Sequence, residues 1–308
     1  MNHWQPTTTL DVLQLRAAII AKIRAFFTRR HVLEVETPLL STSTNPAVHL
    51  NSFSVINHPP LYLQTSPEFA MKRLLAAGSG DIYQISKAFR AQENGRLHHI
   101  EFTMLEWYRV NFTHYDLMDE VGQFLHFVLN TAETSRITYR DLFLQYLNVD
   151  PFGPTDDLKK IARQQGLNAS LDDDHDAWLQ LLLTHLIEPH LGEKHPLLVY
   201  DFPATQAMLA RINPNNPQTA ERFELYFKGM ELANGFHELN NPQEQRARFV
   251  QENKIREQLN LPSIPLDEKF LASLASLPPC SGVALGVDRL VMIAAQVNSL
   301  AEVLTFIE

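Results

Sequence analysis

The sequence contains very little cysteine. Cys280 is the only cysteine among 308 residues, so no disulfide can form within the chain and no group of thiolates can hold a structural zinc ion. We therefore expect a reducing compartment, the cytoplasm. No apolar run reaches the roughly 18 residues that a membrane helix requires, and no basic segment followed by an apolar run stands at the N-terminus. We expect neither secretion nor membrane insertion.

Positive charge is also in short supply. Lys and Arg number 26 against 35 Asp and Glu, which gives a formal net charge of −9. This balance argues against a protein whose main role is to neutralise a nucleic-acid backbone. The apolar share of 45% and the charged share of 20% are typical of globular domains, so the chain has enough apolar residues to bury a core.

Two common phosphate-binding signatures are absent. The chain has no G-x-x-x-x-G-K-[ST] motif, and Gly78-Ser79-Gly80 lacks both the third glycine and the strand-to-helix position of a dinucleotide-binding fingerprint. These absences exclude a P-loop nucleotidase and a Rossmann dehydrogenase.

The order of periodic segments predicts one α+β domain over residues 1–308, a mainly antiparallel sheet flanked by helices. Residues 114–147 read as mainly helical, and the more polar stretch 150–198 as a possible small helical insertion. In the helix after residues 61–63, Ser66 is the expected N-cap and Gly78 the expected C-cap. The other expected elements are helices at 12–30, 240–259 and 287–297, strands at 32–36, 222–229 and 281–286, and a hairpin of 81–92 with 100–110.

Charged residues occupy the predicted hairpin, where the sheet should bury them. Arg90 lies near the end of the first strand, and alternation places Met104, Glu106 and Tyr108 on one face of the second. Because buried arginine and carboxylate groups need partners, these residues form either a structural ion pair or a binding site.

A second group lies in residues 229–239, where Glu231 and Glu238 stand seven residues apart. In an extended strand this odd spacing puts them on opposite faces, so convergence requires a bulge, which we place at Asn234-Gly235. Two convergent carboxylates would suit Mg²⁺ bridging a triphosphate. The alternative is a purely structural pattern.

A third group lies in residues 281–290. Gly282 and Gly286 allow a ligand or backbone to approach closely, and Arg289 begins the final helix on that surface. The alternative is a pair of helix-packing glycines with a surface arginine. The thirteen histidines show no metal-ligand spacing on a helix, and Cys280 reads as an inert buried thiol.

Together, these segments resemble the three ordered motifs of class II aminoacyl-tRNA synthetases. RRHVLEVETPLL resembles motif 1, FRAQENGRLHHIEFTMLEWY motif 2 and GVALGVDR motif 3. TSPEFAMKRLL, EFTMLEWY and ERFELYFKGMELANGFHEL are similar to phrases of the lysyl-tRNA synthetase subgroup. The resemblance covers roughly residues 12–300.

The resemblance implies ATP-dependent formation of an aminoacyl-adenylate by a homodimer that associates through motif 1. Arg90 and Arg289 would bind the α- and γ-phosphates, and Glu231 and Glu238 would face Mg²⁺ and substrate. The remaining implied ATP-binding residues are Ala91, Gln92, His99, Leu232 and Gly286, and the amino-acid-binding residues are Ser66, Pro67, Glu68, Glu106, Tyr108, Asn234, Phe236, Glu238 and Ala284.

The N-terminal region differs from that of lysyl-tRNA synthetases. About ten residues precede the motif 1 helix, which is too few for an N-terminal OB-fold, so we expect no stable tRNA binding. A lysine-activating core of this length resembles the elongation factor P ligases, which join (R)-β-lysine to a lysine of elongation factor P. Motif 3 has Ala284 where the synthetases have glycine, a methyl group that could favour a differently branched substrate.

Motif 2 departs from the family pattern. Where the family has F-R-N-E, this chain has Phe89-Arg90-Ala91-Gln92, so an amide replaces the acidic residue unless Glu93 takes its place. Where the family has H-N-P-E-F, this chain has HHIEF at residues 98–102. We expect retuned ATP binding. Two alternatives stay open: a paralogue that uses α-lysine or another acceptor, and a catalytically weakened binding or regulatory protein.

Overall fold

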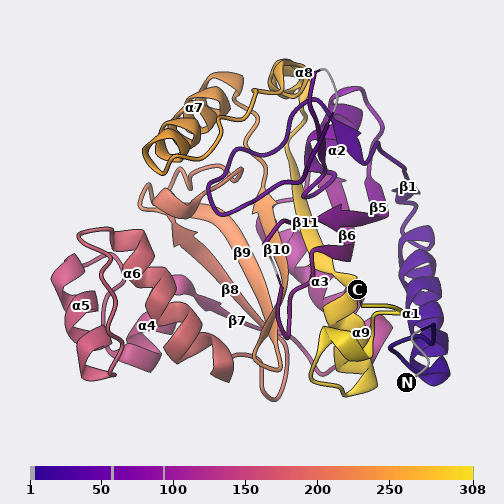
Figure 1. Cartoon of the computed structure of the whole chain (residues 1–308), viewed down its shortest axis with the longest axis horizontal. Coiled ribbons are helices and arrows are strands. Elements are labelled where there is room, and N and C mark those ends of the chain that lie inside the picture. The colour runs from indigo at the N-terminus through magenta and orange to yellow at the C-terminus, as the bar shows by residue number, and fades with distance from the viewer. Residues whose placement is uncertain (1–3, 57–58, 93, 308) are drawn as a thin grey trace.

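An eight-stranded sheet runs through the centre of the computed structural model, which describes residues 4–56, 59–92 and 94–307 (Figure 1). Its strands lie in the order β1-β5-β6-β11-β10-β9-β8-β7, and β2-β4-β3 form a separate three-stranded sheet. The strands are β1 (Leu33–Glu34), β2 (Leu40–Ser41), β3 (Ser54–Val55), β4 (Leu61–Leu63), β5 (Ile82–Phe89), β6 (Glu101–Val110), β7 (Ser135–Thr138), β8 (Leu197–Pro203), β9 (Thr219–Phe227), β10 (Met230–His237) and β11 (Cys280–Gly286).

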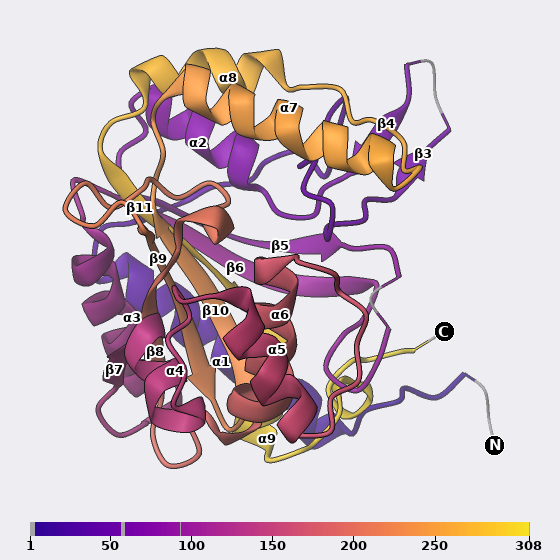
Figure 2. The same ribbon diagram turned by 90° about the vertical axis from the view of Figure 1, so that its left-hand side faces the viewer.

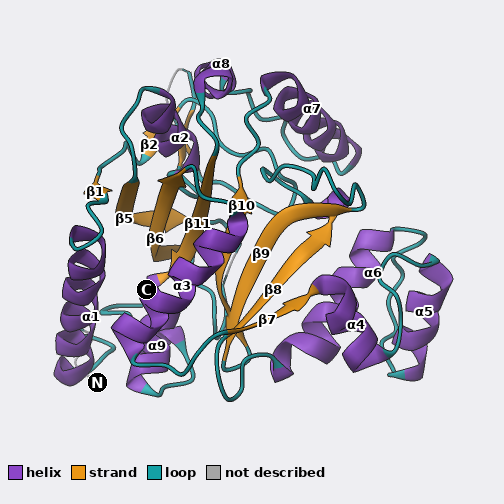
Figure 3. Cartoon of the chain, turned by 180° about the vertical axis from the view of Figure 1, so that it is seen from behind, coloured by secondary structure: helices purple, strands orange, loops and turns teal. Residues whose placement is uncertain are grey.

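Helices cover both faces of this sheet (Figures 1 and 2). Seen from behind, α3 crosses the sheet with α1 and α9 beside it, while α2, α7 and α8 lie at the opposite end of the view (Figure 3). No helix in the described ranges combines the length and the apolar character needed to cross a bilayer. The α-helices are α1 (Leu10–Thr28), α2 (Glu68–Ala76), α3 (His114–Leu129), α4 (Tyr139–Leu147), α5 (Thr155–Gln164), α6 (His175–Leu182), α7 (Pro242–Gln258), α8 (Glu268–Ser273) and α9 (Val287–Ala295).

The large sheet is antiparallel except at its two edges. The pairs β1 with β5 and β7 with β8 are parallel, and the other neighbours are antiparallel. The predicted hairpin is confirmed, since β5 pairs with β6 in a continuous register from Ile82 opposite Tyr108 to Phe89 opposite Glu101. The α+β class and the mainly antiparallel sheet are therefore confirmed.

The largest apolar core lies between the back of the sheet and α1, α3 and α9. Phe26, Phe27, Trp107 and Phe124 are completely buried there, with ring centroids 5.2–6.1 Å apart in the contacting pairs. Aromatic side chains bury large apolar areas and prefer such edge and tilted contacts. This core holds the sheet rigid, so that side chains on its front face are fixed in position.

Helix ends are set by local hydrogen bonds. The Thr113 side chain accepts from the Asp116 amide while the Asp116 carboxylate accepts from the Thr113 amide, a capping box that starts α3. The N-cap of α2 lies one residue later than expected, at Pro67 instead of Ser66. Pro67 is the flanking residue, and Ser66 Oγ accepts from the Glu68 amide at 3.0 Å. Gly78 follows the end of α2 with φ +89°, a conformation that favours glycine.

Residues 114–147 are mainly helical, as expected, because they contain α3 and α4; the short strand β7 lies between the two helices and pairs in parallel with β8. One local expectation was wrong. The bulge in β10 does not lie at Asn234-Gly235. The register shifts between Glu231 and Ala233, and Asn234 and Gly235 continue in regular pairing with β9.

Residues 150–198 contain α5 and α6, followed by a π-helical turn at Leu183–Ile187. Together with α4 they pack on a second apolar cluster against β8, where Phe143, Leu158, Leu179 and Val199 are fully buried. The stretch is helical as expected. Its status as an insertion into a single domain stays a prediction.

We predict that Gly235→Ala destabilises the fold. A Cβ atom at Gly235 would lie 2.3 Å from the ring of Phe223, which faces it on β9 and is fully buried. Overpacking of this kind costs about 1–3 kcal/mol. Urea unfolding, followed by circular dichroism, measures the loss.

Gly95→Ala provides the matched control, because a Cβ atom there has no neighbour within 4 Å. It should unfold within about 0.5 kcal/mol of the wild type. Equal stability of the two variants would mean that Phe223 has room to move.

Candidate active site

A cavity of about 1170 Å³ opens on the front face of the sheet, between β6, β9, β10, β11, α2 and α7. Its size exceeds the 300–1,000 Å³ typical of small-molecule sites, which is enough for a nucleotide and an amino acid together. All of the residues predicted for the site line it except Ala91 and Gln92. The predicted ATP contacts of these two residues stay predictions.

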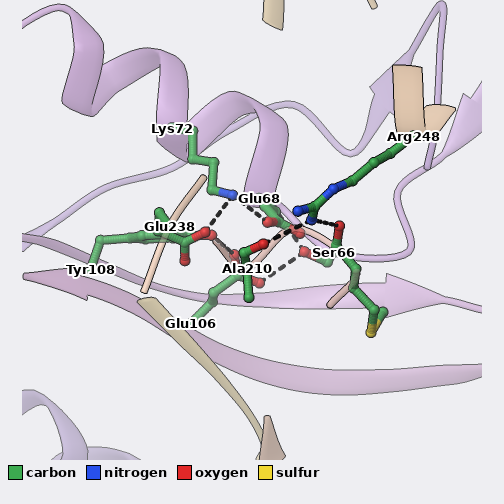
Figure 4. Close-up of polar contacts among 9 residues, drawn as sticks. Ser66, Glu68, Lys72, Glu106, Tyr108, Ala210, Glu238 and Arg248 are labelled. Carbon is green, nitrogen blue, oxygen red and sulfur yellow. Dashed lines mark hydrogen bonds and ion pairs between the residues drawn. The ribbon is translucent and has the colours of Figure 1, made fainter. Parts of the chain in front are cut away.

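A buried lysine lies at one end of the cavity, on α2. Lys72 is fully buried, and its Nζ lies 2.7 Å from Glu68 Oε1 and 2.5 Å from Glu238 Oε2 (Figure 4). Glu68 is one helical turn before Lys72, whereas Glu238 follows the end of β10. Helical spacing and the sheet therefore bring two carboxylates to one ammonium group.

A third carboxylate, Glu106, lies beside this pair. It is 2% exposed on β6, and its two oxygens accept hydrogen bonds from Tyr108 Oη at 2.6 Å and from Ser66 Oγ at 2.9 Å. We call Ser66, Glu68, Lys72, Glu106, Tyr108 and Glu238 the Lys72 cluster. It contains three carboxylates and one cationic side chain.

Burial and mutual repulsion shift the pKa values of this cluster. Burial, reinforced by Glu68, raises the pKa of Glu106 to about 7, and burial raises that of Glu238 to about 8 although Lys72 opposes the change. Burial alone would lower the pKa of Lys72, but Glu238 and Glu68 hold it above its ordinary value. Lys72 therefore keeps its proton, and its single positive charge is too little to neutralise the three carboxylates when all are ionised.

The backbone of β11 passes close to these side chains. Gly282 pairs with Tyr108 on β6, and a Cβ atom at this position would lie 2.3 Å from the Tyr108 ring and 2.6 Å from Glu238 Oε1. Only glycine fits here. Ala284, two residues on, stands opposite Glu106 on one side and Asn234 on the other, and it lines the cavity.

A second polar group lies further along β9 and β10. Glu224 Oε1 accepts from Asn234 Nδ2 at 3.0 Å and from the Arg222 guanidinium, and Glu224 Oε2 accepts from Tyr226 Oη at 2.5 Å. Burial raises the pKa of Glu224 to about 7, and the negative charge of Glu231 contributes while Arg222 opposes it. Glu224 and Glu231 thus form an acidic pair on the cavity wall.

The two carboxylates predicted to bind Mg²⁺ have different neighbours. Glu231 acts on Glu224, whereas the charges acting on Glu238 are those of Lys72, Glu68 and Glu106. Among the described residues, no cationic side chain forms a salt bridge with the Glu231 carboxylate. Joint metal binding by Glu231 and Glu238 stays a prediction, and Glu224 is an acidic neighbour that the sequence analysis did not single out.

The two predicted phosphate-binding arginines both line the cavity. Arg289 is held by the backbone oxygens of Leu97 and Glu231, at 3.2 and 2.6 Å, and lies 2.9 Å from His98 Nε2. Arg90 lies over the Phe102 ring, 5.1 Å from its centroid. Glu93, considered as a substitute for Gln92, is outside the described residues.

The sequence analysis missed three residues that line the cavity, Arg222, Glu224 and Arg248, and also Lys72, which lies buried beside it. Arg248 on α7 donates to the carbonyl oxygens of Met208 and Ala210 at 2.9 and 2.8 Å, which ties the helix to the loop after β8 (Figure 4). The alternation of Arg222, Glu224 and Tyr226 along one strand was a usable signal, because period-two polar residues on a buried strand share a face. For Lys72, the spacing of four residues after Glu68 indicated their pairing, but nothing in the sequence indicated its contact with Glu238.

Comparison with known proteins gives one consistent family. The family model of class II tRNA synthetases (D, K and N) matches residues 3–308. A Vibrio vulnificus protein named "Elongation factor P--(R)-beta-lysine ligase" is 51% identical over 98% of this chain and 97% of its own length. Proteins of the same name from Vibrio cholerae and Haemophilus ducreyi are 50% and 47% identical, over 99% of this chain and 98% and 96% of theirs.

We predict that Glu106→Gln stabilises the protein increasingly as pH rises. Because the pKa of Glu106 is raised in the folded state, the folded state binds more protons than the unfolded state, and wild-type stability falls as pH rises from about 4.5 to 7. The variant avoids this loss, a gain of roughly 1–3 kcal/mol at pH 8. Denaturant unfolding at pH 5, 6.5 and 8 without ligand measures it.

Glu101→Gln is the control, because Glu101 is exposed at the start of the same strand. It should shift stability equally at all three pH values. A stability difference between Glu106→Gln and the wild type that does not grow as pH rises would contradict the charge balance described above.

Proposed function

This chain belongs to the class II tRNA synthetase family of the D, K and N type, and from that membership we propose that it is a ligase for (R)-β-lysine and elongation factor P. It uses ATP to activate the amino acid and transfers the β-lysyl group to the ε-amino group of a lysine on elongation factor P. The names of the relatives, which match it over nearly their full length, support this activity. The observation that carries it is the charge of the Lys72 cluster.

Three carboxylates against one ammonium leave two formal negative charges when the cluster is ionised. Protonation of Glu106 and Glu238, whose pKa values are raised, relieves this surplus in the free protein, and two cationic groups of a ligand would neutralise it in the ionised state. Lysine and β-lysine each carry two ammonium groups, so either isomer satisfies the count. A neutral side chain would leave a buried carboxylate unpaired, which is the strongest form of rejection that a pocket offers. We assign Glu68 to one ammonium group and Glu106, Tyr108 and Glu238 to the other.

The choice between the isomers is assigned to Ala284. Its methyl group enters the cavity between Glu106 and Asn234, where it narrows the space beside the α-carbon of the substrate. Ser66, Pro67 and Phe236 complete this part of the wall. Differences of about one methylene typically discriminate about 10- to 200-fold.

ATP occupies the other end of the cavity. We assign Arg90 to the α-phosphate and Arg289 to the γ-phosphate, with Leu232, Gly286 and His99 around the nucleotide and Ala91 and Gln92 near its base. The acidic pair Glu224 and Glu231 suits a hard cation such as Mg²⁺, because carboxylate groups offer negative charge and the oxygen ligands that this ion prefers. When bound, Mg²⁺ would neutralise charge on the phosphate oxygens.

The reaction proceeds in two balanced steps. A carboxylate oxygen of β-lysine attacks the α-phosphorus, the bond to the β-phosphate bridging oxygen breaks, and pyrophosphate leaves. The acceptor amine of elongation factor P then attacks the acyl carbon of the adenylate, releases a proton and displaces AMP. The first step depends on alignment and on stabilisation of charge by the arginines, more than on acid or base catalysis.

The test of this proposal is ATP–pyrophosphate exchange with (R)-β-lysine, α-lysine or no amino acid. We expect exchange that depends on the amino acid and a preference for (R)-β-lysine of about 10- to 200-fold in kcat/KM. Elongation factor P incubated with enzyme, ATP and (R)-β-lysine should then gain the mass of one lysyl residue.

Ala284→Gly should reduce the isomer preference with little change in ATP binding, while Glu238→Gln should abolish amino-acid-dependent exchange. Exchange without any amino-acid preference would contradict the role of Ala284. Absence of exchange with every lysine isomer would contradict the enzymatic proposal as a whole and favour a binding protein.

We further propose that the chain works as a homodimer in the cytoplasm and does not bind tRNA stably. The motif 1 region supplies the edge strand β1, where Leu33 is 56% exposed and pairs on one side only. An apolar residue on a free sheet edge favours pairing with another chain. The net charge of −9 disfavours a tRNA complex.

Leu33→Glu should therefore shift the sedimentation mass from twice 35.2 kDa towards 35.2 kDa at micromolar concentration. Leu259→Glu is the matched control, since Leu259 is also 56% exposed but lies after α7, far from this edge in the chain. A wild-type monomer, or equal effects of the two variants, would contradict an interface at β1.

A further inference from the structure

A compact group of two histidines and a carboxylate lies outside the cavity. His114 begins α3, Glu221 is on β9 and His237 ends β10, and their nearest ligand atoms all lie within 4.8 Å of one another. The three residues are only 2%, 7% and 8% exposed.

This group is on the opposite face of the sheet from the cavity. Arg222, Phe236 and Glu238 line the cavity, whereas their chain neighbours Glu221 and His237 do not. Successive side chains of a strand point to opposite faces. The group is therefore separate from the site that would bind ATP and the amino acid.

His114 is the feature that ordinary packing leaves unexplained. Both of its ring nitrogens are buried and neither has a hydrogen-bond partner, while its ring lies 4.0 Å from that of Tyr115 and 6.4 Å from that of His237. Burying a polar group without a partner costs free energy. A histidine that serves only to fill space would be replaced by an apolar residue at no loss, so its unused nitrogens point to a ligand.

We propose that His114, Glu221 and His237 bind one Zn²⁺ ion, with water completing the coordination. Two imidazole nitrogens and one carboxylate oxygen form a donor set typical of zinc, and imidazole ligands disfavour Mg²⁺ and Ca²⁺. Tetrahedral zinc with ligands at about 2.0–2.2 Å brings donor atoms within about 3.5 Å of each other. Zinc binding would draw the three donor atoms, which now lie within 4.8 Å of one another, to this closer spacing.

Arg211 provides positive charge at this group when no metal ion is bound. Its Nε lies 2.6 Å from Glu221 Oε2, and His237 Nδ1 lies 2.8 Å from the same oxygen. The Arg211 side chain is 39% exposed, so it has a path into solvent when zinc takes its place. The charge of Asp201 also acts on this region, since Glu221 contributes to the raised pKa of Asp201.

Zinc at this position would join the start of α3 to the ends of two central strands. His237 is followed directly by Glu238 of the Lys72 cluster, so the metal would fix the backbone that presents Glu238 to the cavity. Its predicted role is structural, and it does not depend on the proposed ligase activity.

The test is metal binding by the full chain, with any affinity tag removed. Titration with Zn²⁺ by calorimetry, and with Co²⁺ by visible absorption, should show one tight site per chain. His114→Leu should weaken Zn²⁺ binding more than about 100-fold, because even changes outside the ligand shell commonly cost about 10- to 100-fold. Arg211→Gln should strengthen binding, since it removes the competing cation.

Unfolding temperatures separate a ligand from a structural histidine. Without metal, His114→Leu should be at least as stable as the wild type, because it removes no hydrogen bond. With Zn²⁺, the wild type should gain stability and this variant should not. His185→Leu is the matched control, since His185 is exposed, and it should bind Zn²⁺ like the wild type. A wild type without a tight site, or unchanged binding in His114→Leu, would overturn the proposal.

Discussion

A buried excess of negative charge is the constraint on which the centre of this molecule depends. Glu68, Glu106 and Glu238 share one ammonium group, that of Lys72. Carboxylates in such a place are expensive unless hydrogen bonds and cations surround them. The hydroxyls of Ser66 and Tyr108 supply hydrogen bonds to Glu106, and the sheet keeps the carboxylates close together. Under the proposed function, a cationic ligand in the cavity would relieve this excess charge, which would couple the stability of the protein to its specificity.

Much of the fold follows from local sequence patterns. The hairpin of β5 and β6 and the strand-to-helix passage of β11 and α9 were predictable, because period-two and period-3.6 patterns report directly on which face is buried. The missed strand β7 has four residues and pairs only with β8. So short a strand carries too little alternation to be recognised, and its identity comes from a partner about 60 residues away in the chain.

The sequence predicted which residues lie at the candidate site better than it predicted which of their side chains contact one another. Of the residues that motif resemblance identified, all except Ala91 and Gln92 line the cavity. The resemblance did not indicate that Lys72 forms an ion pair with Glu238 or that Glu224 lies near Glu231. A bulge at one position rather than another reverses which side chains share a face. The same limit applies to His114 and His237, which are separated by more than a hundred residues and meet only because α3 crosses behind β10.

The edges of the large sheet carry a consequence for the folding chain. β1 has two residues and β7 has four, and each pairs in parallel with its single neighbour. Long, flat edge strands offer rows of unpaired amide and carbonyl groups on which other chains can assemble into fibrils. Here the long strands with the most buried residues, such as β9 and β11, lie inside the sheet with neighbours on both sides. The architecture thus protects its most aggregation-prone segments as soon as the outer strands have formed.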